Sequence, residues 1–197
     1  MEGTNPVNKK LVAALSGGAA LVVALTGCGG GGGESDKEAN DWAKTVCDEV
    51  QPQLKKIQSA NASIQAASDE QDSKKLQQTD SEAFKDISEA YAALGKAVQN
   101  AGPPPVDNGE KIQKQAVKEL NSTSQAYKDL QTAVDKLDTS DKAKFAAGLN
   151  DIADQLNKLS SSGDQALKKL QEGKVGKAMA KQPGCQKPKG TSTASPS

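Results

Sequence analysis

The stretch IQKQAVKELNSTSQAYKDLQTAVDKL, residues 112–137, decides the fold class of this chain. Its apolar and small residues recur at steps of four, four, three, four, three, four and three. This spacing keeps one face of an α-helix apolar, as in the heptads of helical bundles. The stripe consists of Ile112, Ala116, Leu120, Thr123, Tyr127, Leu130, Val134 and Leu137. The segment therefore predicts an amphipathic helix that buries one face against other helices.

Two helices of the same kind are expected before this segment. Residues 36–66 carry an apolar stripe, and Pro52 near its middle is expected to kink that helix. A second stripe covers about residues 70–100. Its regular part is expected to start at Thr79-Asp80-Ser81-Glu82, because this order of residue types is a capping box. Gly102-Pro103-Pro104-Pro105 then ends the helix.

A further helix is expected after residue 137. Asp107 followed by Glu110 is expected to cap the helix of residues 112–137, and another apolar stripe runs from Phe145 to Leu170. Residues 160–163, Ser-Ser-Ser-Gly, form a weak point in that last stripe. Short connections make consecutive long helices antiparallel. The sequence thus predicts an all-α fold, an up-down-up-down four-helix bundle.

Two of the three cysteines are expected to join the ends of the bundle. Cys47 and Cys185 form an even pair, and in an oxidising compartment a disulfide is their expected state. Two free buried thiols are the alternative. The first helix starts and the last helix ends at the same end of such a bundle, so the two residues can meet. Cys47 and Cys185 lie at the same height along the bundle axis if the chain turns at Gly173 and residues 174–181 fold back as a short helix that ends at Pro183-Gly184.

The N-terminus has the pattern of an export signal. Lys9 and Lys10 precede an apolar run over residues 11–25, and Leu25-Thr26-Gly27-Cys28 ends it. This tetrad resembles the lipobox of bacterial lipoproteins. The resemblance implies that residues 1–27 are a signal peptide and that Cys28 carries a diacylglyceryl group, the only cofactor-like group expected. The alternatives are an uncleaved transmembrane helix, for which the run is short and interrupted by glycine, and an ordinary signal peptide with a chance cysteine.

The rest of the chain divides by composition. Residues 28–35 are a glycine-rich tether that reaches about 15 Å as a flexible coil. Residues 36–185 are expected to form the helical bundle domain. Residues 186–197 are rich in Ser, Thr and Pro and are expected to be a disordered tail.

Four stretches resemble a known family. They are Asn8-Lys9-Lys10-Leu11, Asp41-Trp42-Ala43-Lys44-Thr45-Val46-Cys47, Pro104-Pro105-Val106-Asp107-Asn108-Gly109 and Ala178-Met179-Ala180-Lys181-Gln182-Pro183-Gly184-Cys185. In these stretches, which spread over nearly the whole chain, the sequence is similar to the lipid-anchored "small secreted proteins" of streptomycete-type actinobacteria. The resemblance implies a location and a fold, and it implies no mechanism.

The composition excludes several function classes. The chain has 25 basic and 25 acidic residues, no His and only 3% aromatic residues, and all of its cations are lysines. Without arginine forks and aromatic platforms, a nucleic-acid partner is not expected. Without His, Arg and a free thiol, the usual general bases, oxyanion clamps and nucleophiles are missing as well. No enzyme activity and no catalytic residue are therefore expected.

Clustered carboxylates are the remaining candidates for chemistry. Glu82, Asp86 and Glu89 share one face, but that face lies opposite the apolar stripe and is expected to be solvated. A weak calcium site at residues 69–72 is an alternative, although the segment lacks the spacing and the glycine of an EF-hand loop. The sequence thus predicts no metal ligands.

Three other features bear on binding. A run of lysines without acids follows Glu172, and it is expected either to contact an anionic membrane surface or to serve as a solubilising tail. These lysines are Lys174, Lys177, Lys181, Lys187 and Lys189. Tyr91 and Tyr127 are expected to line a small pocket or to point their hydroxyls to the bundle rim. Trp42 is expected either to pack in the domain or to dip into the membrane interface.

The first hypothesis for function is a non-enzymatic cell-envelope lipoprotein on the outer face of the cytoplasmic membrane. It would be held by membrane lipid through Cys28 and would act on an envelope protein or a cell-wall polymer as a structural or interaction module. The alternative is an extracytoplasmic carrier of a small ligand, with a pocket between the helices.

Overall fold

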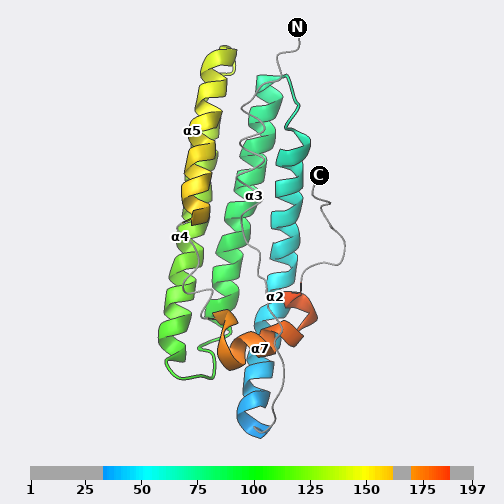
Figure 1. Ribbon diagram of the computed structural model, residues 1–197, viewed down its shortest axis with the longest axis vertical. Helices are drawn as coiled ribbons and strands as arrows, with labels where there is room; N and C mark the ends of the chain where they lie inside the picture. The colour runs from blue at the N-terminus through cyan, green and yellow to red at the C-terminus, as the bar shows by residue number, and fades with distance from the viewer. Residues whose placement is uncertain (1–32, 162–169, 187–197) are drawn as a thin grey trace, which may run out of the picture.

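The computed structural model describes residues 33–161 and 170–186, and all regular structure in these ranges is helical (Figure 1). The elements are α2 (Gly33–Ala66), α3 (Ser73–Asn100), α4 (Gly109–Asp135), α5 (Lys142–Ser161), α7 (Gly173–Lys181) and the 3₁₀ turn η1 (Pro183–Cys185). The predicted fold class is confirmed: long helices joined by short connections pack as a bundle, and a short fold-back helix follows them. The predicted signal peptide, Cys28, the rest of the predicted tether before Gly33 and the predicted tail after Gln186 lie outside the described residues.

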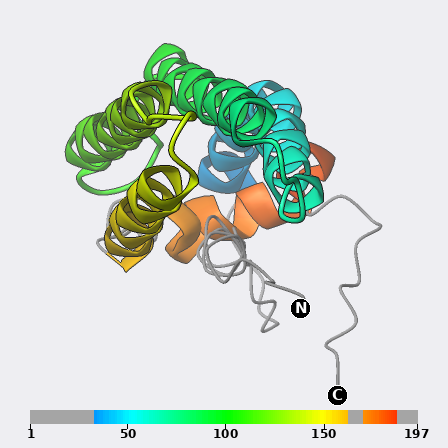
Figure 2. The ribbon, with the colours of Figure 1, turned by 90° about the horizontal axis from the view of Figure 1, so that it is seen from above.

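The long helices pack in chain order. Seen from above, α2, α3 and α4 lie side by side, α5 lies against α4, and α7 crosses the bundle near α2 (Figure 2). The closest backbone packing joins α3 to α4, and α2 to α3 comes next. One continuous core fills the space between the helices, with Phe84 and Ile87 of α3 fully buried at its centre. The helix α2 continues through Pro52 without interruption, and its described part already includes Gly33, three residues before the expected start.

The start of α3 differs from the prediction. The N-cap is Asp72, whose Oδ1 accepts hydrogen bonds from the backbone N–H groups of Lys74 at 2.9 Å and Lys75 at 3.2 Å. Thr79 lies inside the helix, where its hydroxyl donates to the carbonyl of Lys75 at 3.0 Å. The capping-box interpretation was therefore wrong. Asp72 is an equally good cap, and the earlier start adds Leu76 to the buried face of α3.

Polar side chains join α3 to α4 at three levels. In the middle, the hydroxyls of Ser88 and Ser124 each donate to the other residue's backbone carbonyl at 2.8 Å. At one end, the Gln77 amide donates to the carbonyls of Val134 and Leu137 at 2.8 and 2.9 Å, close to the last turn of α4. At the other end, the Gln113 amide donates to two terminal carbonyls of α3 at 3.1 Å. The glutamine bonds satisfy carbonyl groups that helix ends leave open, and all of these bonds set the register of the two helices.

The connection between α3 and α4 also differs from the prediction. The N-cap of α4 is Asn108, in the left-handed conformation at φ 61° and without a side-chain capping bond, so Asp107 is not the cap. The left-handed turn brings Gly109 under the backbone of Pro104, where a Cβ would overlap the Pro104 carbonyl. Glu110 does lie in the first turn, where its charge suits the helix dipole.

The helix α5 follows its predicted stripe. Asp141 caps it by accepting from the N–H groups of Ala143 and Lys144 at 3.0 and 3.1 Å. Its buried residues are Phe145, Leu149, Ile152, Ala153 and Leu156. The structure describes this helix through Ser161, and the rest of the predicted weak point and the later stripe position Leu167 lie outside the described residues.

Candidate functional site: the disulfide end of the bundle

The disulfide end comprises the first half of α2, the loop 101–108, α7 and η1. Cys47 and Cys185 form the predicted disulfide here, with their Cα atoms 5.0 Å apart and both side chains buried. Gly184 rests directly on the backbone of Cys47, and a Cβ at this position would overlap the Cys47 carbonyl. The bond therefore holds η1 tightly against α2.

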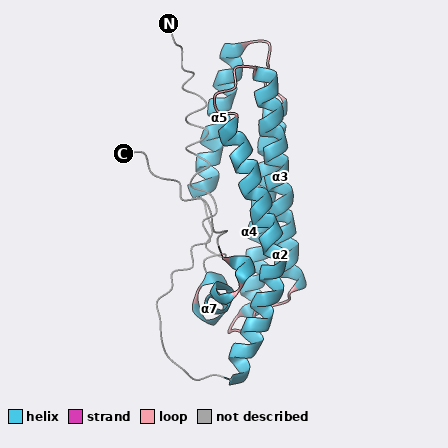
Figure 3. Cartoon of the chain, turned by 90° about the vertical axis from the view of Figure 1, so that its right-hand side faces the viewer, coloured by secondary structure: helices cyan, strands magenta, loops and turns pink. Residues whose placement is uncertain are grey.

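The fold-back helix forms where the sequence predicted it. Gly173, at φ 61°, makes the turn that precedes α7, a conformation that other residues adopt with strain. Val175, Ala178 and Met179 bury one side of the short helix, and α7 packs beside α2 (Figure 3). The left-handed turn at Gly173 and the disulfide thus fix the two ends of this segment.

The described lysines of the predicted basic segment lie on one side of α7. Lys174, Lys177 and Lys181 are exposed, opposite the buried side of the helix. The Nζ of Lys174 is 4.0 Å from Oδ1 of Asp36 in the first turns of α2. Lys187 and Lys189 lie outside the described residues. The structure thus brings the basic helix next to the start of the domain.

Trp42 packs inside this end rather than facing outward. Its side chain is buried in the core, and the indole N–H donates to the carbonyl of Gly102 at 2.9 Å. Because this bond spans α2 and the loop 101–108, the tryptophan fixes the loop on the first helix. The packing alternative for Trp42 is confirmed.

Hollows on the surface of this end are shallow. One of about 570 Å³ is lined by residues 104–107 of the loop, Ile112 of α4 and residues around the start of α7. Its wall mixes apolar side chains with the charges of Asp107, Glu172 and Lys174. The volume falls within the range of small-molecule pockets, although such pockets are usually more enclosed.

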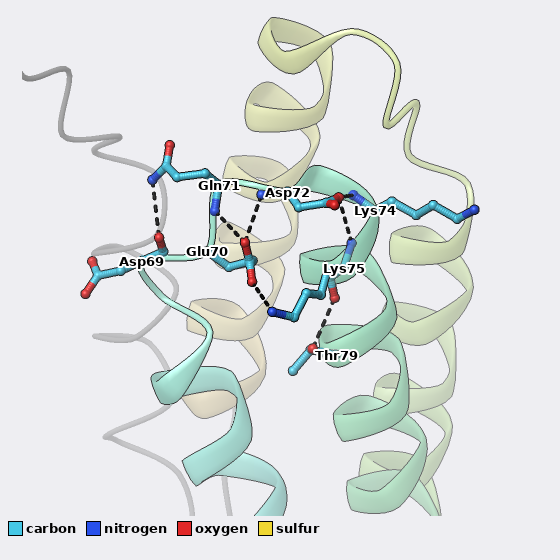
Figure 4. A network of polar contacts seen from close by, with 7 residues as sticks. All are labelled: Asp69, Glu70, Gln71, Asp72, Lys74, Lys75 and Thr79. Carbon is cyan, nitrogen blue, oxygen red and sulfur yellow. Dashed lines mark hydrogen bonds and ion pairs between the residues drawn. The ribbon is translucent and has the colours of Figure 1, made fainter.

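The acidic candidates are engaged in structural contacts. At the turn between α2 and α3, one carboxylate oxygen of Glu70 accepts from the N–H groups of Gln71 and Asp72 at 2.9 and 3.0 Å, and the other lies 2.6 Å from Lys75 Nζ (Figure 4). The bond from Lys75 is the main cause that lowers the pKa of Glu70. Within residues 33–161 and 170–186, no group of three or more acidic or thiol side chains has the geometry of a metal site.

The second acidic group contacts a lysine of the neighbouring helix. Asp86 and Glu89 lie 3.2 and 2.6 Å from Lys56 Nζ of α2. The bond from Lys56 is the main cause that lowers the pKa of Glu89. Glu82 is exposed. This group forms a surface ion-pair network between α2 and α3.

The two tyrosines meet between α3 and α4. The rings of Tyr91 and Tyr127 stack at 5.7 Å with an interplanar angle of 10°, and Phe84 lies 6.2 Å from Tyr127. Both tyrosines are half-buried. Burial raises the pKa of Tyr127 to about 12, so its hydroxyl stays protonated at neutral pH.

Sequence reasoning missed one titratable group, Asp80. It lies on the core side of α3 between Leu76 and Phe84, its side chain is 1% exposed, and its Oδ1 has no hydrogen-bond partner. Burial alone raises the pKa of Asp80 to about 7. The signal was present in the sequence, because steps of four from Leu76 lead through Asp80 to Phe84, but the capping-box interpretation concealed it.

Comparisons of the chain with protein-family models, with curated proteins and with solved structures found no significant match. Among the helices that the structure describes, none has a stretch apolar and long enough to cross a bilayer.

Proposed function

We propose that this chain is a lipid-anchored, non-enzymatic protein of the cell envelope. Cys28 attaches it to the outer face of the cytoplasmic membrane, and its helical domain acts through contacts with an envelope protein or a wall polymer. The tetrad Leu25-Thr26-Gly27-Cys28, placed directly after a basic and then apolar segment, is the observation that carries this proposal.

The disulfide supports export. Cys47 and Cys185 are bonded in the folded domain, and structural disulfides persist in oxidising compartments outside the cytosol. The bond closes most of the domain into one loop and so stabilises its folded state against the unfolded chain.

The position of α2 supports a short tether. Gly33 is the first described residue of α2, and residues 28–32 lie between it and Cys28. Even when fully extended, five residues span at most about 18 Å. The disulfide end, where α2 begins, would therefore be the part of the domain nearest the bilayer.

The state of the carboxylates supports a non-enzymatic role. Without His and Arg, acid-base chemistry in this chain depends on Asp, Glu, Lys and Tyr. Glu70, Asp86 and Glu89 are engaged in ion pairs, and Asp72 caps α3. A small-ligand carrier is the second candidate, and the hollow of about 570 Å³ beside the loop 101–108 favours it.

Replacing Cys28 with serine tests the anchor. The processed, membrane-bound form should disappear, and the mature wild-type protein should have Cys28 as its acylated N-terminal residue in a mass spectrum. Gly31→Ser, which changes the tether and leaves the tetrad intact, should stay anchored. A mature N-terminus elsewhere, or maturation that globomycin does not block, would contradict the proposal.

Native mass spectrometry of the anchored protein, extracted in mild detergent, separates the two candidate functions. A carrier should show a reproducible ligand mass beside the mass of the acylated chain. An interaction module should show the acylated chain alone or with a protein partner.

A further inference from the structure

The exposed side of α7 is a narrow basic stripe on a fixed support. At 100° per residue, Lys174, Lys177 and Lys181 lie within about 60° of one another around the helix axis. The opposite side is buried, and the disulfide follows only four residues after the last of these lysines. The three charges therefore act together, without the cost of ordering a flexible tail.

The basic stripe lies close to the start of α2, the part of the domain that follows the proposed lipid anchor in the chain. Lys174 is 4.0 Å from Asp36, which is eight residues after Cys28. Because five residues span at most about 18 Å, the anchor would hold the start of α2, and with it this end of α7, close to the bilayer. Attraction between exposed charges is largely screened beyond one Debye length, about 8 Å at physiological salt, so it acts where the domain lies with these lysines against the headgroups.

The surroundings leave part of this charge available. Asp36 and Glu172 flank the first lysine, and the same end of the domain also carries Glu38, Asp41, Asp48, Glu49 and Asp107. Within the described part of the chain, Lys177 and Lys181 form no ion pair, and both are exposed. Lys177 and Lys181, two of the three lysines in the stripe, are therefore available to bind negatively charged groups outside the protein.

Resting on the proposed anchor, we infer that the stripe Lys174, Lys177 and Lys181 docks on anionic phospholipid of the membrane that holds the protein. The domain then lies with the α7 side against the bilayer, and the turn between α2 and α3 points away from it. Each lysine that reaches the headgroups raises partitioning about fivefold. The anchor supplies the high local concentration that makes such weak contacts sufficient.

Lysine acetylation on vesicles tests this orientation. The acylated wild-type protein is reconstituted into vesicles of phosphatidylcholine alone and of phosphatidylcholine with phosphatidylglycerol, and acetylation rates are measured by mass spectrometry. On the anionic vesicles, the rates at Lys177 and Lys181 should fall about threefold or more, and high salt should restore them. Lys128 and Lys136, exposed near the far end of α4, are internal controls whose rates should not change.

Two variants complete the test. Lys177→Gln with Lys181→Gln should leave Lys174 equally reactive on both kinds of vesicle, whereas Lys128→Gln with Lys136→Gln should keep the protection of α7. Equal rates at α7 on neutral and anionic vesicles at low salt would overturn the inference. Protection that appears only with purified anionic wall polymer would overturn it in favour of the wall as the partner. A protein without an acyl group would not enter the vesicles at all, so failure of the proposed anchor is recognised separately.

Discussion

Asp80→Asn is expected to stabilise the protein at neutral pH and to remove most of the pH dependence that this carboxyl group imposes on folding. Asp80 is 1% exposed and lies on the buried stripe of α3, and its Oδ1 has no hydrogen-bond partner. Ionised side chains at the same level lie outside the core: the last ten residues of α2 contain none, and Lys128, Asp129, Asp135 and Lys136 of α4 are exposed. The folded state therefore favours the neutral acid.

The size of the effect follows from the two pKa values. Burial raises the pKa of Asp80 from 3.8 to about 7, so the folded protein keeps a proton that the unfolded chain releases. The resulting stabilisation is fully present below pH 3.8 and is lost as the pH rises to about 7. At about 1.4 kcal/mol per pH unit, the free energy of unfolding loses up to about 4 kcal/mol over this interval. Asparagine stays neutral throughout and avoids this loss.

The measurement is urea unfolding of the full chain in mild detergent, followed by circular dichroism between pH 4 and pH 8. The difference in unfolding free energy between Asp80→Asn and wild type should grow by up to about 4 kcal/mol from pH 4 to pH 8. Glu82→Gln removes an exposed carboxylate from the same helix and should follow the wild-type profile. Parallel profiles for wild type and Asp80→Asn would refute the reasoning, because they would mean that the carboxyl group titrates alike in both states.

The structure leads to two further predictions about stability. Replacing both Cys47 and Cys185 with alanine should lower the unfolding free energy by about 5 kcal/mol, the chain-entropy value for a sequence separation of 138. That loss corresponds to a fall of about 10–20 °C in Tm by calorimetry, and two alkylatable thiols in the native protein would contradict the premise. Asp72→Ala should cost about 1 kcal/mol because it removes the cap of α3, whereas Thr79→Ala should change stability by less than about 0.5 kcal/mol. The reverse order in urea unfolding would mean that the helix starts at Thr79.

Local sequence determined most of the helices. An apolar stripe with the period of a helix is a property of the segment itself, so the pattern of residues 112–137 predicts α4 without knowledge of its neighbours. The turn at Gly173 and the pairing of Cys47 with Cys185 were also predictable. Few residues allow such a turn, and the chain offers one other partner for a disulfide once Cys28 is assigned to lipid.

Tertiary packing decided the start of α3 and the environment of Asp80. Asp72 and Thr79 are both acceptable caps, and the choice depends on the burial of Leu76, which a local pattern does not reveal. Asp80 occupies a position that suits either a cap or a core stripe, and only the packing of the neighbouring helices makes it a buried acid. The periodicity of a sequence identifies the face of a helix that will be covered. The three-dimensional arrangement determines what covers that face, and with it the pKa of every polar group placed there.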